Sequence, residues 1–193
     1  MWSTIGLVIQ AKPVDALRNI AAPRDLIEWV RKLPPETAAR SSWVDATRAD
    51  WMPYLAAMRG IGTEAILRAV CECAVETAGS IEGPEAERVL ATLRDTAGRG
   101  KAALATTEKD LADLKLAIIQ WGNKTAPIAR PLWMYWAELL LELARAASRG
   151  NVLVGVSLAA RLLANANTIG KPNARPAHLD LVARLREKLT LAG

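Results

Sequence analysis

The stretch PLWMYWAELLLELARAASRGNVLVGVSLAARLLA, residues 131–164, decides the fold of this chain. Its two halves, 131–147 and 152–164, are apolar around most of a helical circumference, which is typical of helices at the centre of a helical protein. Gly150 and Asn151 leave only a short turn between them. Helices joined by a short turn pack side by side in opposite directions, so we expect an antiparallel hairpin at the core.

Amphipathic helical patterns continue on both sides of this hairpin. Ser42, Asp50 and the pair Thr107 and Asp110 are placed where helix-capping residues occur. Prolines and glycines mark the breaks between the patterns. Apolar residues recur at helical spacing in the expected helices 23–33, 43–49, 51–59, 63–78, 84–97, 107–121 and 177–191. The sequence therefore predicts an all-α, single-domain multi-helix bundle of about eight helices.

The N-terminal 22 residues lack this pattern. The apolar run from Ile5 to Ile9 suits either a short strand or an extended arm. A chain of 193 residues fits one domain, so we divide it into an N-terminal arm, 1–22, and a helical bundle domain, 23–193.

The charge of the chain is unevenly distributed. The total is +5, but residues 1–100 carry 12 Lys/Arg and 13 Asp/Glu, whereas residues 101–193 carry 13 and 7. A basic half predicts either a solvated basic surface or an anionic partner, such as an acidic protein, a nucleic acid or a membrane surface.

Neither export nor membrane insertion is expected. Residues 1–10 lack the basic segment and the long apolar run of a signal peptide. Acidic and basic residues interrupt the most apolar stretch, 131–164, so that it contains no uncharged run of about 18 residues. We therefore expect a cytoplasmic protein without a membrane span.

Few residues suggest catalytic or metal chemistry. His178 is the single histidine, which leaves no two-histidine metal site, and its place near a helix start suits an exposed residue. Cys71 and Cys73 lie two apart inside an expected helix, where zinc pairs do not occur, so we expect one buried and one peripheral thiol. The segment around Gly98 lacks the serine or threonine of a phosphate-binding loop at Ala102.

Paired carboxylates are the remaining signal for an enzyme. Glu138 and Glu142 share one face of an apolar helix, where they form either an acid pair in a cleft or a solvated stripe continued by Arg145 and Arg149. An enzyme using Asp50, Glu138 and Glu142 is the least favoured hypothesis, because no nucleophile and base are recognisable. We predict no catalytic, cofactor-binding or metal-binding residues.

Aromatic and basic side chains are the candidate binding groups. Four aromatic residues fall at helical spacing: Trp121, Trp133, Tyr135 and Trp136. This spacing is more typical of core residues than of residues that stack on nucleic-acid bases. An exposed tryptophan among them would instead be an anchor for a protein partner. In the last helix, the apolar residues Leu179, Val182, Leu185 and Leu189 are expected to face inward, and Arg184, Arg186 and Lys188 outward.

Three segments carry a family resemblance: SSWVDATRADWMPYLAAMRG (41–60), AILRAVCECA (65–74) and PEAERVLATLRDTAGRGKA (84–102). They resemble a family of small helical bacterial immunity proteins, whose pattern includes an Arg/Gly-Asp-Trp turn and a Cys-x-Cys-Ala helix. In this chain the turn reads Arg-x-Asp-Trp, from Arg48 to Trp51. Residues 103–193 depart from that family. The matching positions are Trp43, Arg48, Asp50, Trp51, Tyr54, Leu55, Cys71, Cys73, Ala74, Arg94 and Gly98. The resemblance implies a helical protein that binds and neutralises a toxin without catalysis.

We therefore predict a non-catalytic protein-binding protein whose partner is another protein, such as a cognate toxin with an acidic surface. The alternative is a basic helical protein that binds nucleic acid, with affinity that falls steeply with salt. The sequence does not indicate the oligomeric state. The residues expected to contact the partner are Trp133, Trp136, Arg145, Arg149, Arg184, Arg186 and Lys188.

Overall fold

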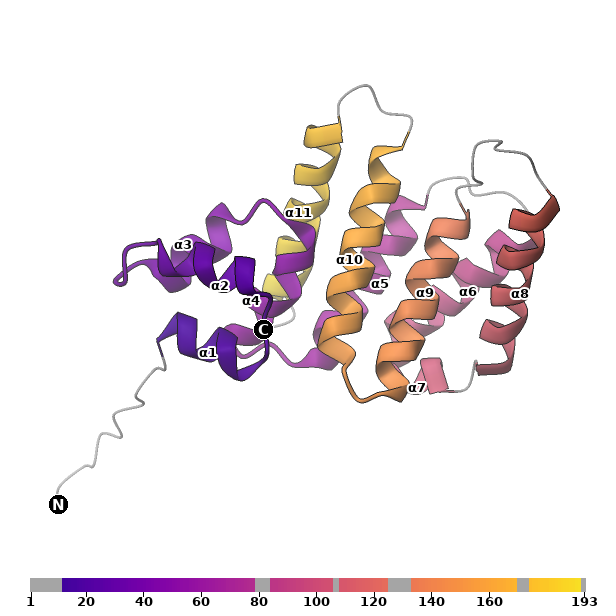
Figure 1. The fold of residues 1–193 in the computed structure, drawn as a ribbon, viewed down its shortest axis with the longest axis horizontal. Coiled ribbons are helices and arrows are strands. Elements are labelled where there is room, and N and C mark those ends of the chain that lie inside the picture. Colours follow the sequence, from indigo (N-terminus) through magenta and orange to yellow (C-terminus); the bar gives the residue numbers. More distant parts are fainter. Residues whose placement is uncertain (1–11, 79–83, 106–107, 125–132, 170–173, 192–193) are drawn as a thin grey trace, which may run out of the picture.

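A computed structural model describes residues 12–78, 84–105, 108–124, 133–169 and 174–191. These residues form helices without a strand, which confirms the all-α fold class (Figure 1). The described segments contain more helices than the eight expected. In chain order they are α1 (Pro13–Asn19), α2 (Arg24–Arg31), α3 (Ala38–Asp45), the 3-10 helix η1 (Ala49–Trp51), α4 (Met52–Met58), α5 (Thr63–Thr77), α6 (Pro84–Arg99), α7 (Lys101–Ala105), α8 (Glu108–Lys124), α9 (Trp133–Ser148), α10 (Val152–Thr168) and α11 (Ala174–Leu191).

The long helices form two layers. Helices α11, α10, α9 and α8 follow one another across the front of the molecule in Figure 1, and α5 and α6 lie behind them. Helix α10 packs against α9, α11 and α5, whereas α8 packs chiefly against α9 and is the end helix of its layer. The short helices α1 to α4 form the opposite end of the molecule.

The predicted antiparallel hairpin is formed by α9 and α10 and is confirmed. Gly150, between them, has a φ of 75°, a left-handed conformation that glycine adopts without strain. Gly155 on α10 lies against α9, and a Cβ atom there would be 2.1 Å from the Cβ of Ala146. The close approach of the two helices therefore depends on the missing side chain of Gly155.

Helix α5 carries the expected apolar stripe into the core. Ile66, Leu67, Val70 and Cys71 are fully buried. A hydrogen bond joins the layers, because the indole Nε1 of Trp136 on α9 donates to the carbonyl oxygen of Ala74 on α5 at 2.7 Å.

Some expected boundaries and caps were wrong. Residues Pro13–Asn19 of the expected arm form α1, whose first position is held by a proline. The helix expected at 43–49 lies at Ala38–Asp45, where the buried Ser42 hydroxyl donates to the carbonyl of Ala39 at 3.3 Å instead of capping a helix. The carboxylate of Asp50 is bound by Arg48 and makes no cap. Thr107 and the run 5–9 lie outside the described residues.

The last helix differs from the sequence-based expectation at one apolar position. Val182, Leu185 and Leu189 are buried as expected, but Leu179 keeps 38% of its surface exposed. Leu179 lies near the start of α11, where the expected inward face is therefore not fully covered.

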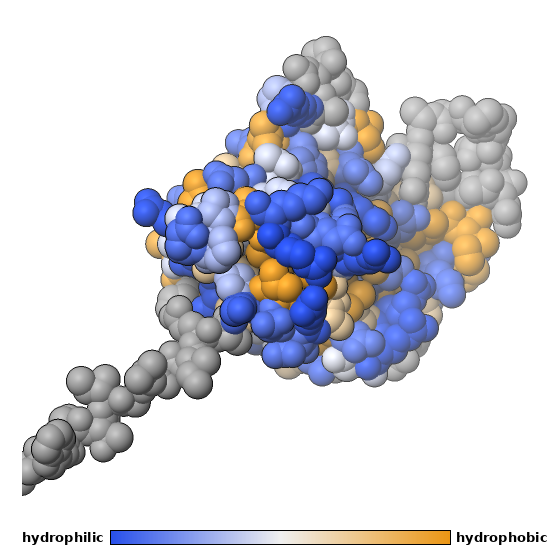
Figure 2. Space-filling model, turned by 60° about the vertical axis from the view of Figure 1, so that its left-hand side comes forward, coloured by the Kyte–Doolittle hydropathy of each residue, from blue (hydrophilic) through white to orange (hydrophobic). Residues whose placement is uncertain are grey.

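The surface at the α1–α4 end is mostly hydrophilic (Figure 2). Hydrophobic residues appear there in small areas among charged ones. Within the described segments, every helix is too short or too polar to cross a bilayer.

Candidate functional site

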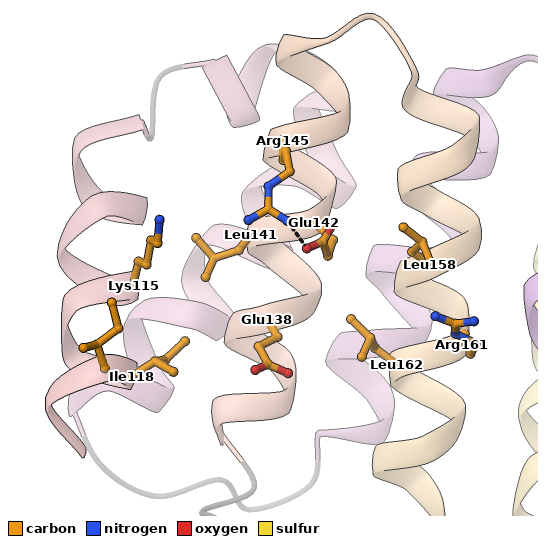
Figure 3. A pocket seen from close by; sticks show the side chains of 10 residues that line it. Lys115, Ile118, Glu138, Leu141, Glu142, Arg145, Leu158, Arg161 and Leu162 are labelled. Atoms are coloured by element: carbon orange, nitrogen blue, oxygen red, sulfur yellow. Dashed lines mark hydrogen bonds and ion pairs between the residues drawn. The ribbon is translucent and has the colours of Figure 1, made fainter. Parts of the chain in front are cut away.

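A groove lies over α9 and between α8 and α10 (Figure 3). Its cavity volume is about 530 Å³. Helix α9 supplies the floor, and α8 and α10 supply the two walls. We call it the α8–α10 groove, defined by its lining residues Lys115, Ile118, Ile119, Glu138, Leu141, Glu142, Arg145, Leu158, Arg161 and Leu162.

Half of the lining side chains are apolar. Leu141 projects from the floor, Ile118 from one wall and Leu158 and Leu162 from the other. Ile119, also on the α8 wall, keeps 49% of its surface exposed. The groove therefore presents aliphatic side chains from three helices to one open side.

The charged side chains of the groove divide into two groups. On the floor, the guanidinium of Arg145 donates a hydrogen bond to the carboxylate of Glu142. Glu138, one turn earlier, also has an interaction partner. On the walls, Lys115 and Arg161 are exposed and form no hydrogen bond or ion pair among the described residues. The unpaired charge on the walls is therefore positive.

Of the two tryptophans expected to bind a partner, Trp136 is a core residue. Only 3% of its surface is exposed, and its indole N–H is already bonded to α5. Its assignment to a binding surface was therefore wrong. Trp133 is half-buried and packs against the core. Arg145 lines the groove, and Arg149 is exposed just beyond the end of α9.

Two of the three α11 cations that were expected to contact a partner stabilise the fold. The guanidinium of Arg186 donates to the carbonyl oxygens of Trp43 and Ala46, both at 3.0 Å. The ammonium of Lys188 lies 2.7 Å from Glu76 and 3.1 Å from Glu72, and the hydrogen bond to Glu76 is the main cause of its raised pKa.

The expectation that Arg186 and Lys188 face outward was wrong. Packing brings the end of α3 and the acidic residues of α5 to α11, which a helical pattern on α11 alone does not reveal. Arg184 is exposed and pairs with Asp180 on its own helix at 2.9 Å.

The Arg-x-Asp-Trp motif forms a second polar cluster, in which Arg48 is the centre. Its guanidinium donates to both carboxylate oxygens of Asp50, at 3.1 and 2.6 Å, and to Asp25 on α2 at 2.5 Å. The hydrogen bond to Asp50 is the main cause of its raised pKa. The same guanidinium lies 4.6 Å from the ring centre of Trp51, which contacts Trp29 at 5.0 Å.

The Arg48 cluster serves to join α2 to η1. Both carboxylate oxygens of Asp50 accept a hydrogen bond from Arg48. The Nε1 atom of Trp51 is, within the described residues, the one buried side-chain nitrogen or oxygen without a hydrogen-bond partner. Contacts on the ring faces, and not the indole N–H, therefore hold Trp51 in place.

The two cysteines are both fully buried, so the expectation of a peripheral thiol was wrong. Burial raises the pKa of Cys71 and of Cys73 to about 12, which leaves both thiols uncharged at neutral pH. Cys73 turns inward because α11 covers that side of α5. Among the described residues, no group of three His, Cys, Asp or Glu side chains is placed to hold a metal ion.

Sequence reasoning found the floor of the groove but missed its walls. Glu138, Glu142 and Arg145 were recognised as one stripe, whereas Lys115, Ile118, Ile119, Leu158, Arg161 and Leu162 were not assigned to a site. The available signal was that α10 is apolar on more than one face, which indicates a second surface to be covered.

Comparisons with protein-family models, with curated proteins and with solved structures found no match to the chain. The function is therefore argued from the geometry of the groove and from the resemblance of residues 41–102.

Proposed function

We propose that this protein is a non-catalytic binding protein that holds another protein in the α8–α10 groove. The observation that supports this proposal is an apolar surface, built by three helices, that the described residues leave uncovered; its two walls carry Lys115 and Arg161, which have no ion-pair partner in that part of the chain. Protein-binding surfaces combine an apolar centre with a charged rim in this way. Apolar contact supplies most of the affinity, and the rim charges select and orient the partner.

The partner we propose is a toxin with an acidic surface, which the chain would neutralise as an immunity protein in the cytoplasm of a bacterium. The resemblance of residues 41–102 supports this finer proposal. In the fold, that segment includes α5 and α6, which pack behind α10 and α9. The groove itself comes from residues 115–162, outside the resemblance, which agrees with a shared scaffold and a partner particular to this chain.

Three of the residues first expected to contact the partner remain available on the surface near the groove. Arg145 lies in it, Arg149 comes directly after the end of α9, and the half-buried Trp133 begins that helix, which forms the floor. Arg184, on α11, is exposed but pairs with Asp180. We therefore place the main contact at the groove and not at the last helix.

Affinity capture with the full chain tests the protein-binding function. Leu158→Glu places a charge on the apolar wall of the groove, and Val44→Glu makes the same change at an exposed apolar residue of α3. We expect the unchanged chain and Val44→Glu to retain one specific protein from the native host, and Leu158→Glu to lose it. Circular dichroism would show that both variants are folded.

Equal capture by all three chains would show that the partner does not bind in the groove. Capture of no specific protein by the unchanged chain would overturn the protein-binding function. Nucleic acid retained at about 50 mM salt and released at about 200 mM, in place of a protein, would favour the nucleic-acid alternative.

A growth assay tests the immunity role separately. We would express each chain together with the protein encoded beside it in its genome, and expect the unchanged chain and Val44→Glu to prevent growth arrest. Leu158→Glu should fail to protect. Specific capture of a protein without any protection from growth arrest would overturn the toxin part and leave protein binding intact.

A further inference from the structure

Resting on the proposed function, we infer that the part of the partner held in the α8–α10 groove is an amphipathic α-helix whose apolar stripe is flanked by acidic side chains. The shape of the apolar surface indicates the helix, and the distribution of charge indicates its acidic flanks.

The apolar surface follows the axis of α10. Val154, Leu158 and Leu162 recur there at intervals of four. Leu158 and Leu162 line the groove, and Val154, just beyond the lining, keeps 42% of its surface exposed. At about 1.5 Å per residue, this stripe is about 12 Å long. A surface of this length fits about two turns of a helix laid along it, which is a common mode of peptide recognition.

The opposite wall offers a matching apolar edge. On α8, Ile118 and Ile119 line the groove, and Ile119 keeps 49% of its surface exposed. Among the described residues, α8 packs chiefly against α9, which leaves these two isoleucines open to an occupant. A helix lying over α9 would therefore contact aliphatic side chains on both sides, as an apolar stripe spanning about 100° of a helix requires.

The charges specify what flanks that stripe. Lys115 stands on the α8 wall and Arg161 on the α10 wall, so cations border the groove on both sides (Figure 3). Neither forms an ion pair within the described residues, whereas Glu142 on the floor is bonded to Arg145. An occupant with acidic residues on both flanks would pair with both walls, while a basic one would be repelled by both.

Two designed peptides serve as probes. Each has 16 residues with leucines at helical spacing, flanked by glutamates in one peptide and by lysines in the other. Binding to the full chain is measured by fluorescence anisotropy. We expect the acidic peptide to bind at least tenfold more tightly than the basic one, and to bind more weakly as salt increases.

A double charge reversal tests the walls. Lys115→Glu with Arg161→Glu should reverse the order of the two peptides. Arg68→Glu with Arg94→Glu is the matched control, because these exposed arginines lie on α5 and α6, away from the groove lining. It makes the same change in net charge and should leave the order unchanged.

Equal binding of the two peptides, or equal effects of the two double variants, would overturn the acidic-helix inference. Loss of the captured host protein in Leu158→Glu but not in Lys115→Glu/Arg161→Glu would overturn it too, while leaving the proposed function standing. A chain that dimerises on its own, and becomes monomeric with Leu158→Glu, would replace the partner helix by a second copy. If the proposed function itself is wrong, neither the unchanged chain nor any variant will capture a specific host protein.

Discussion

Helix α10 has two apolar faces with different surroundings. Val156, Ala160 and Leu163 are almost completely buried against the core. Leu158 and Leu162, on the other side, line the groove and are only partly buried. The same contrast holds for cations, since Arg48 is bound to Asp25 and Asp50 while Arg161 has no described partner. Apolarity and charge in the sequence therefore do not distinguish a residue that holds the fold from one left available to a partner.

The largest expected effect on stability comes from a comparison of two neighbouring leucines on the two faces of α10. Leu163→Ala would leave a cavity in the core and should lower the free energy of unfolding by about 2–5 kcal/mol. Leu162→Ala, on the groove side, should cost about 1 kcal/mol, because water already reaches this side chain. Urea denaturation measures both values, and equal costs would mean that the groove face is as fully packed as the core.

The next comparison uses two helical glycines. Gly155→Ala puts a Cβ atom into Ala146 and should destabilise the protein by about 3 kcal/mol, since the hairpin must separate to make room. Gly98→Ala on α6 meets no atom within 4 Å and should stabilise by up to about 1 kcal/mol. Thermal unfolding gives both signs, and stabilisation by Gly155→Ala would contradict the close packing of α9 on α10.

The third comparison concerns the two arginines. Arg48→Ala removes the hydrogen-bond donors of the nearly buried carboxylate of Asp50 and should cost about 2 kcal/mol. Arg161→Ala should change stability by less than about 0.5 kcal/mol and lower only the affinity for an acidic helix. A stability loss of the same size in both variants would show that Arg161 also serves the fold.

The last effect depends on pH. Burial raises the thiol pKa of Cys71 and Cys73 from about 9 to about 12, so above pH 9 the unfolded chain releases protons that the folded chain keeps. The stabilisation from the two buried, uncharged thiols is therefore complete below about pH 9 and decreases as the pH rises, by about 1.4 kcal/mol for each thiol at pH 10.

Urea denaturation of the chain and of Cys71→Ala/Cys73→Ala at pH 8 and pH 10 tests this effect. The difference between the two chains should shrink at pH 10. A difference that is the same at both pH values would show that the thiols are ionised equally in the folded and unfolded states.

Much of the fold was predictable because its signals are local. The α9–α10 hairpin and the buried stripe of α5 follow from apolar spacing and from the glycines and prolines that end each helix. Helix α1 was missed because its apolar pattern is short. The groove was only partly predictable, since its walls come from segments more than 30 residues apart, at Lys115 and Arg161.

The sequence by itself determined where most helices begin and end, because neighbouring residues decide helical periodicity and its interruption. Only the tertiary structure decided which apolar faces are covered and which cations are paired. Arg186 is bound by a carbonyl 143 positions earlier, and Cys73 is buried by a helix more than 100 residues later in the chain. Such partners are brought together by packing, so whether a side chain stabilises the fold or remains available for binding is a property of the assembled helices.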